Sequence, residues 1–247
     1  MENERRFELT SAGLHILAML LMLCDHAWHT VVQGNDWMNC VGRIAFPIFA
    51  FMIVEGYFHT RNLKKYALRM LLFAVISEIP FNLMASGGWL YPFHQNVLWT
   101  FLISIGAIHL NELARRSGKT MLRIIAAVFT ILAGYVLGFI TMVDYYGAGV
   151  LMVLAFYFFR GRKWWCFAGQ LAAMYYLNCV MLGGFSYVIQ AFGTEMLFPR
   201  QGFAMLALIP IWLYRGRQGY SSRWFKLLCY WFYPVHMVVL MLPYMMM

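Results

Sequence analysis

The chain has 247 residues, of which 62% are hydrophobic and only 12% are charged, and its formal net charge is +9. Soluble globular domains carry about 25% charged residues, so this composition excludes an ordinary soluble domain and indicates an integral membrane protein. The basic residues form short clusters between apolar runs, which is typical of cytoplasmic loops and not of a nucleic-acid-binding stripe. We therefore expect the lipid bilayer, and no nucleic acid, as the surroundings of this protein.

Nine apolar segments follow one another along the chain, most of them long enough for a bilayer-spanning helix. They cover residues 12–33, 41–59, 65–85, 97–114, 120–141, 145–160, 163–182, 201–214 and 224–245. Two of them, 145–160 and 201–214, are short, so eight spans are the alternative. The polar residues 1–13 precede a first span that lacks a cleavage site, and we expect this span to be retained in the mature protein.

The basic residues predict the orientation of these spans. With the N-terminus inside, 17 of the 19 Lys and Arg residues fall in predicted cytoplasmic loops, whereas the outer loops contain only Arg200. The sequence thus predicts an all-α polytopic integral membrane protein, with residues 1–247 forming a single domain of about nine transmembrane helices, N-terminus inside and C-terminus outside. The longest connection, 183–200, is then expected to be an outer loop.

Small residues and prolines predict local features of the helices. Gly134 and Gly138 predict a close helix contact on the fifth span. Pro47 and Pro234 remove backbone hydrogen bonds inside spans and predict kinked helices around a polar chamber. The five cysteines show no CxxC spacing, so we expect packing thiols and no metal site.

Ionisable and amide side chains recur at one depth of the predicted bundle, where they are costly unless they form a site. Asp25 and His26 lie in the first span, and at 1.5 Å per residue His26 is about 18 Å from the start of that span, in the outer half of the membrane. The other polar residues near this depth are Arg43, Glu78, His94, Asn96, Asp144 and His236.

Several of these residues also have a structural explanation. Arg43 and Glu78 are alternatively a structural ion pair. His94 and Asp144 are alternatively solvated loop residues. The convergence at one depth favours a site.

Asp25 and His26 are expected to have different roles, because neighbouring residues on a helix do not face each other. Asp25 is expected to contact Arg43, or His29 one turn later. His26 can act as a base near neutral pH. A carboxylate of another helix, Glu78 or Asp144, is a candidate to orient its ring.

An ordered set of motifs resembles the TraX family. They are Leu-Cys-Asp-His at 23–26, Gly-Arg-Ile-Ala-Phe-Pro-Ile-Phe-Ala-Phe at 42–51, Val-Glu-Gly-Tyr-Phe-His-Thr-Arg at 54–61, Ser-Glu-Ile-Pro-Phe at 77–81, Gln-Asn-Val at 95–97 and Tyr-Pro-Val-His at 233–236. The motifs cover both ends of the chain and most of its first hundred residues, whereas residues 120–200 match only in hydropathy.

The founding activity of this family is acetylation of the N-terminal amine of a conjugative pilin, and the family is similar to wider transmembrane acyltransferases that use cytoplasmic acyl-CoA. The resemblance implies a multi-pass protein of the bacterial inner membrane, with acetyl-CoA as donor and a peptide, glycan or small molecule as acceptor. It implies a catalytic set with His26 as the base, consisting of Asp25, His26, Arg43, Glu78 and His236. Either Arg43 or Asn96 is expected to stabilise the oxyanion.

Two sets of binding residues are expected beside this catalytic set. The expected acceptor-binding residues are His94, Asn96, Asp144 and Tyr233. The expected coenzyme-binding residues are basic side chains of the predicted inner loops together with His15, where related sequences often carry lysine: His15, Arg61, Lys64, Lys65, Arg115, Arg116 and Lys119. The alternative for the loop residues is that they only satisfy the positive-inside rule.

Two other classes of function remain open from the sequence. One is a proton-coupled transporter in which His26, Glu78 and His236 form a relay. The absence of a visible internal repeat in the sequence argues against it. The other is a structural or assembly subunit whose polar residues only specify helix packing.

Overall fold

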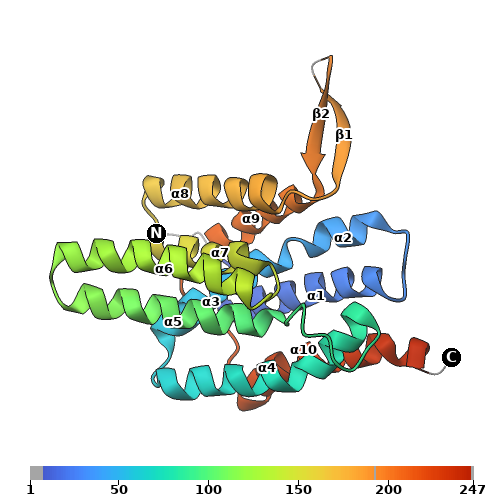
Figure 1. Cartoon of the computed structure of the whole chain (residues 1–247), viewed down its shortest axis with the longest axis horizontal. Coiled ribbons are helices and arrows are strands. Elements are labelled where there is room, and N and C mark those ends of the chain that lie inside the picture. The colour runs from blue at the N-terminus through green and yellow to red at the C-terminus, as the bar shows by residue number, and fades with distance from the viewer. Residues whose placement is uncertain (1–7, 192, 246–247) are drawn as a thin grey trace, which may run out of the picture.

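The computed structural model describes residues 8–191 and 193–245, and these form a helical bundle with one small sheet (Figure 1). The helices run roughly parallel and antiparallel to one another, and two of them contain a π-helical or 3-10 segment at one end. The elements are α1 (Ser11–His29), α2 (Asp36–Gly42), α3 (Ala45–His59), α4 (Leu63–Ser86), α5 (Val97–Arg116), α6 (Thr120–Ile140), α7 (Tyr146–Phe158), α8 (Trp164–Tyr175) with η1 (Tyr176–Leu182), β1 (Ser186–Ala191), β2 (Thr194–Pro199), η2 (Arg200–Ala207) with α9 (Leu208–Leu213), and α10 (Arg223–Met245).

Seven of the helical stretches that the structure describes are long and apolar enough to cross a membrane. The two short spans of the sequence-based prediction correspond to shorter apolar helices, Tyr146–Phe158 and Arg200–Leu213. At 1.5 Å per residue, the 13 residues of α7 extend only about 20 Å, against a hydrocarbon core of about 30 Å. An all-α membrane protein is therefore supported, whereas nine spans and the inside-outside orientation stay predictions.

The second predicted span, 41–59, is not one continuous helix. The chain turns at Arg43 and Ile44, so α2 ends at Gly42 and α3 begins at Ala45. Pro47 lies in the first turn of α3, where its missing N–H and fixed φ are tolerated. The sequence predicts a kink at this proline, and the structure has a break between two helices just before it. The break places Arg43 at a helix junction, with its side chain free to reach α1.

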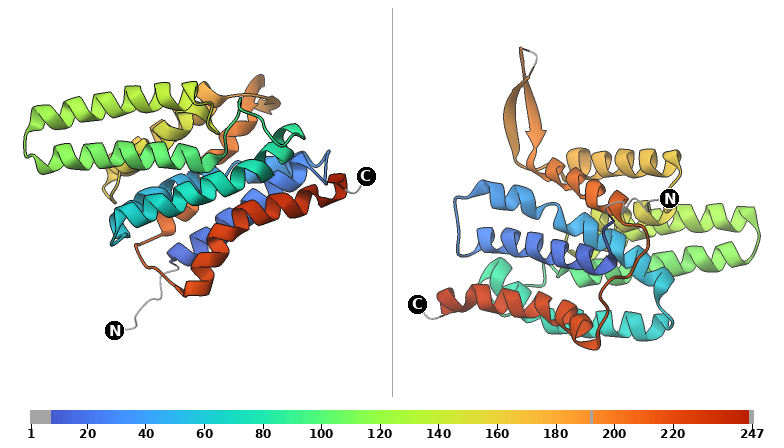
Figure 2. Two further views of the ribbon diagram at one scale, coloured as in Figure 1. Left: turned by 60° about the horizontal axis from the view of Figure 1, so that its bottom comes forward. Right: turned by 180° about the vertical axis from the view of Figure 1, so that it is seen from behind.

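The core is centred on α1, α3, α5 and α7, and the other helices pack around them (Figure 2). Fully buried side chains such as Leu14, Ile48, Ile108 and Leu154 form this core. Helix α6 packs against α7 through Gly134 and Gly138. A Cβ on Gly138 would lie 2.8 Å from the carbonyl oxygen of Tyr146, which confirms the predicted close contact.

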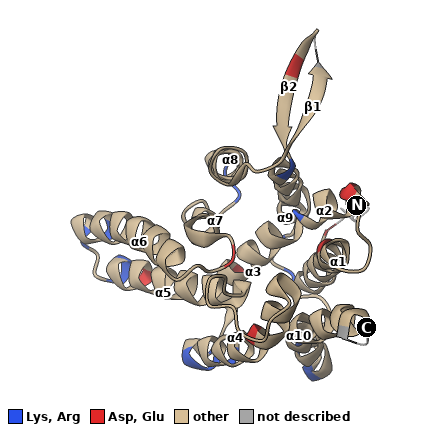
Figure 3. Ribbon diagram, turned by 45° about the vertical axis from the view of Figure 1, so that its right-hand side comes forward, with Lys and Arg blue, Asp and Glu red and all other residues tan. Residues whose placement is uncertain are grey.

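Most of the Lys and Arg residues that the structure describes lie at helix connections at one end of the bundle, and Figure 3 marks them in blue on the ribbon. The connections α3–α4, α5–α6, α7–α8 and α9–α10 share this end because consecutive helices reverse direction. The start of α1 joins them, since the N–H of Ser11 donates to the carbonyl oxygen of Arg217. Arg5 and Arg6, which the sequence analysis counted as cytoplasmic, lie outside the described residues.

The predicted loop 183–200 contains the antiparallel hairpin of β1 and β2, which projects from the bundle (Figure 1). The sequence reason is local, because Tyr187, Val188 and Ile189 on one strand and Phe198 on the other favour strands. Gly193, with φ +76°, occupies the left-handed region at the turn. The long connection is thus structured as a hairpin, and its position on the outer side stays a prediction.

Candidate functional site

A cavity of about 560 Å³ opens at the end of the bundle opposite the basic connections. Its walls come from the C-terminal half of α1, the α2–α3 junction, the end of α4 and the turn before α7. The base of the hairpin closes one side, where Phe185 and Arg200 line the cavity. Of the predicted site residues, Asp25, His26, Arg43, His94, Asp144 and Tyr233 line it.

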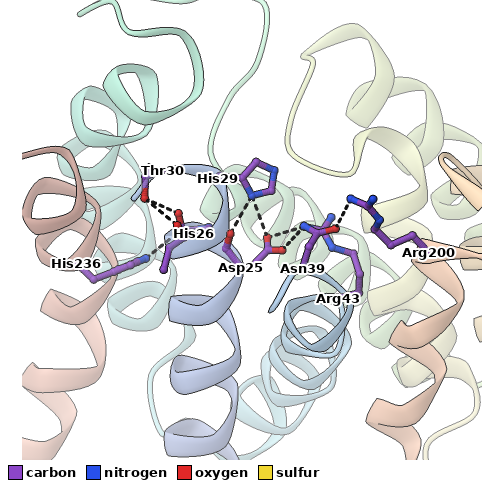
Figure 4. Close-up of polar contacts among 9 residues, drawn as sticks. Asp25, His26, His29, Thr30, Asn39, Arg43, Arg200 and His236 are labelled. Atoms are coloured by element: carbon purple, nitrogen blue, oxygen red, sulfur yellow. Dashed lines mark hydrogen bonds and ion pairs between the residues drawn. The ribbon is translucent and has the colours of Figure 1, made fainter. Parts of the chain in front are cut away.

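Asp25 is the centre of a network on one side of the cavity (Figure 4). Arg43 Nη2 lies 2.5 Å from each of the two carboxylate oxygens, and Asn39 Nδ2 donates to Oδ1 at 2.7 Å. His29 Nδ1 lies farther away, 3.9 Å from Oδ2. The close approach of α2 requires Gly42, because a Cβ there would lie 2.3 Å from the Asp25 Cβ. The predicted pairing of Asp25 with Arg43 is confirmed.

His26 contacts His236 on α10, and not a carboxylate. The two rings are stacked with centroids 4.8 Å apart, and His26 Nδ1 lies 2.6 Å from His236 Nε2 (Figure 4). The expectation that Glu78 or Asp144 orients the His26 ring was wrong. The reason is the rotation of α1, which turns His26 toward α10 while Asp25 faces α2 and α3.

When both rings are neutral, the hydrogen bonds of this pair determine where their protons lie. His236 Nδ1 lies 2.7 Å from the carbonyl oxygen of Phe232, which can only accept, so Nδ1 carries the proton. Nε2 of the neutral His236 ring is then an acceptor, and His26 Nδ1–H donates to it. In this tautomer the lone pair of His26 is on Nε2. His236 thus acts on His26 by orienting it, and His236 does not line the cavity.

Glu78 and Asn96 form a separate buried cluster. Asn96 Nδ2 donates to a carboxylate oxygen of Glu78 and, at 2.8 Å, to the carbonyl oxygen of Ala74, while Trp99 Nε1 donates to Glu78 at 2.9 Å. Asn96 Oδ1 caps α5 by accepting from the N–H of Leu98 at 3.1 Å. Neither Glu78 nor Asn96 lines the cavity. A Glu78–Arg43 ion pair and an oxyanion role for Asn96 therefore do not fit this geometry.

His94 and Asp144 meet at the mouth of the cavity. His94 Nε2 lies 3.3 Å from Asp144 Oδ1, which also accepts from the N–H of Tyr145. The hydrogen bond to this carboxylate raises the pKa of His94 above its ordinary value, although partial burial opposes the shift. The turn before α7 brings these two residues of the connections together, and both side chains stay partly exposed.

Arg200 and Asn39 belong to the site and were missed by the sequence analysis. Arg200 Nη1 donates to Asn39 Oδ1 at 3.1 Å, and its guanidinium lies over the rings of Trp28, Phe185 and Tyr187. Through Asn39 it contacts the Asp25 network (Figure 4). The signal that could have found Arg200 was its position, since it is the one basic residue in the predicted outer loops.

The comparisons with known proteins bear on the whole chain. A family model described as TraX protein matches residues 10–243. This chain belongs to the TraX family. It is similar to the probable fimbrial assembly protein FimC, serogroup H1, of Dichelobacter nodosus, with 27% identity over 96% of each chain. No solved structure matches. The sequence resemblance to the TraX family is thus confirmed, and it extends through the middle of the chain.

The expected coenzyme-binding residues of this TraX family member lie away from the cavity. Those at the α3–α4 and α5–α6 connections are exposed at the opposite end of the bundle, among them Arg61, Lys64 and Lys119. Arg115 lines a second cavity of about 340 Å³ there, together with Arg123. His15 is partly buried on α1, between the two ends. It lies eleven residues before His26 and faces nearly the same direction on the helix.

The transporter relay is not connected in this arrangement. His26 and His236 contact each other, but Glu78 is hydrogen-bonded to Asn96 and Trp99 instead. Within residues 8–191 and 193–245, no group of three or more His, Cys, Asp or Glu side chains is placed to hold a metal ion.

Proposed function

We propose that this pilus-associated membrane protein is an acyltransferase. It moves an acetyl group from cytoplasmic acyl-CoA to an amine, such as a peptide N-terminus, or to a hydroxyl group at the outer side of the inner membrane. Membership of the TraX family and a relative named as a fimbrial assembly protein support this class. The observation that carries the proposal is the His26–His236 pair, which leaves a base directed away from its partner at the wall of a cavity.

His26 Nε2 is the proposed general base. The protonated Nδ1 is held by His236, whose own Nδ1–H is held by the Phe232 carbonyl oxygen. A base that is fixed in one tautomer keeps its lone pair available for the acceptor. In a catalytic triad, a carboxylate fixes the tautomer of the histidine in this way. Here a second imidazole, that of His236, orients the base, while Asp25 forms an ion pair with Arg43.

The proposed reaction is a direct transfer. The acceptor amine loses a proton to His26 Nε2 as its nitrogen attacks the thioester carbonyl carbon. The C–N bond forms, the C–S bond breaks, and the departing thiolate takes the proton from His26. Arg43 is the proposed cation that stabilises the negative charge on the carbonyl oxygen, since it lines the cavity together with His26.

The donor is proposed to approach from the basic end of the bundle. Phe49, at the deep end of the cavity, lies ten residues before His59 on α3, so about 15 Å separates the cavity from that end. A pantetheine arm would have to cover this distance past His15. The phosphates would then contact exposed cations, of which the proposed set is Arg61, Lys64, Lys65, Arg115, Arg116 and Lys119.

The test is acetyl transfer by the purified protein in lipid nanodiscs. We expect thiol release from acetyl-CoA that depends on an added peptide amine, and a decrease in kcat/KM of about 10² to 10⁴ for His26→Ala, the usual contribution of a general base. The matched control is His59→Ala, because His59 is exposed on α3 and, among the described residues, its polar contacts are with Glu55 of the same helix.

A folded His26→Ala variant that transfers acetyl at the wild-type rate would contradict the role of His26. If the wild type moves protons or solute across a liposome membrane without consuming thioester, the acyltransferase proposal fails and transport takes its place.

A further inference from the structure

The β1–β2 hairpin carries apolar side chains that stay exposed among the elements the structure describes. Val188 is 61% exposed and Leu197, its direct partner across the hairpin, is 74% exposed. The contacts of the hairpin with the bundle are at its base, where Tyr187 Oη lies 3.3 Å from Cys40 Sγ. A two-stranded hairpin with exposed apolar residues has marginal stability alone, and its edges are ready to pair with another chain.

The register shows which backbone groups point outward. The N–H of Arg200 donates to the carbonyl oxygen of Phe185 at 2.8 Å, so these two residues form a hydrogen-bonded pair. Pairs alternate along an antiparallel ladder, and the next residues on each strand, Ser186 and Pro199, form a non-hydrogen-bonded pair. The residues that direct N–H and C=O groups outward are thus Ser186, Val188 and Gln190 on β1, and Glu195 and Leu197 on β2.

The two edges of the hairpin differ. On β2, Pro199 lies nearest the bundle and has no N–H to offer, which is a common way to block an edge. On β1, Ser186, Val188 and Gln190 present an unbroken alternating series. Among the residues that the structure describes, no backbone hydrogen bond joins this outer edge to another element.

We propose that the outer edge of β1 binds an extended polypeptide, which adds to the hairpin as a third strand. This inference rests on the proposed function, because the bound polypeptide is the acceptor whose end enters the cavity. Phe185 and Arg200, at the base of the hairpin, line that cavity. Val188 is three residues from Phe185, or about 10 Å along a strand. An acceptor with its N-terminal amine in the cavity would run outward, parallel to β1.

The chemistry of the edge favours a polypeptide over lipid. A polypeptide supplies alternating N–H and C=O groups at strand spacing, which gives affinity through the main chain and selectivity through alternate side chains. Hydrocarbon cannot satisfy these backbone groups, and each unsatisfied group in lipid is costly. On the face of the hairpin that carries the exposed side chain of Val188, an apolar residue of the acceptor would pack beside it.

The test compares two proline variants of the full-length protein in nanodiscs. Val188→Pro removes an outward N–H from the proposed binding edge. Leu197→Pro removes the outward N–H from the opposite edge, at the directly paired position, and is the matched control. The probe is a fluorescent sixteen-residue peptide of alternating valine and threonine with a lysine at each end and a free N-terminus. Reactivity of the buried Cys40 with a maleimide reports whether the hairpin base stays folded in each variant.

We expect saturable binding of the peptide to the wild type and to Leu197→Pro, and a Kd that is about tenfold higher for Val188→Pro, as expected for the loss of one hydrogen bond. Equal weakening by both prolines, or no saturable binding to the wild type, would overturn the proposal. A dimer of the wild type that Val188→Pro dissociates, measured by sedimentation, would show instead that the edge pairs with a second copy. Because binding is measured without acetyl-CoA, failure here is distinct from failure of the acyltransferase assay.

Discussion

His236 is predicted to control the tautomer of His26, and the variants His236→Phe and His236→Gln test this. Phenylalanine keeps a ring in the stack with Phe232 but removes the acceptor for His26 Nδ1–H. A buried donor that loses its acceptor costs about 1–3 kcal/mol, which corresponds to a decrease in kcat/KM between about 5-fold and about 150-fold. Glutamine offers an amide oxygen close to the position of Nε2, so we expect it to restore most of the activity.

Three measurements separate this orienting role from a packing role. Acetyl transfer is measured with all three proteins, and their thermal unfolding is followed under the same conditions. Nitrogen chemical shifts of His26 report its tautomer directly, and we expect a protonated Nδ1 in the wild type and in His236→Gln. The reasoning is refuted if wild-type His26 carries its proton on Nε2. It is also refuted if a folded His236→Phe variant retains wild-type kcat/KM.

Two further predictions concern the walls of the cavity. The raised pKa of His94 stabilises the fold fully below the unfolded value of about 6.5, and this contribution is lost as the pH rises through the folded value. The melting temperature should therefore decrease less between about pH 6 and about pH 8 in Asp144→Asn than in the wild type. If it decreases equally with pH in both proteins, the His94–Asp144 contact is contradicted. Gly42→Ala should destabilise the protein by about 1–3 kcal/mol, since the new Cβ would overlap Asp25, whereas Gly106→Ala meets no atom within 4 Å and should not. Equal melting temperatures for the two alanine variants would refute the close approach at Asp25.

Local chemistry explains why parts of the site could be read from the sequence. Asp25 and Arg43 are both costly in lipid, they lie at one depth of consecutive spans, and opposite charges at that depth are expected to pair. Pro47 predicted a kink in the second span, and the structure has a helix break just before it. The apolar runs determined the membrane class and most helix bounds, because hydrocarbon imposes one length and one composition on every span.

Pairings between distant segments required the tertiary structure. His26 and His236 are 210 residues apart, and whether they meet depends on how α1 and α10 are rotated about their axes. Hydropathy does not encode that rotation, because helices are apolar on both their lipid-facing and their buried sides. For the same reason the sequence left Glu78 available to Arg43 or to His26, whereas packing places it against Asn96 instead.

The sequence by itself determined a polytopic membrane protein of the TraX family with ionisable residues gathered at one depth. The tertiary structure decided which of these residues face the cavity and that His236 orients His26. It also brought Arg200 to them from the base of the hairpin. The physical reason is that burial in lipid acts on each segment separately and leaves its signature in composition. Hydrogen bonds between side chains depend instead on the relative rotation and depth of helices, which all of their packing contacts determine together.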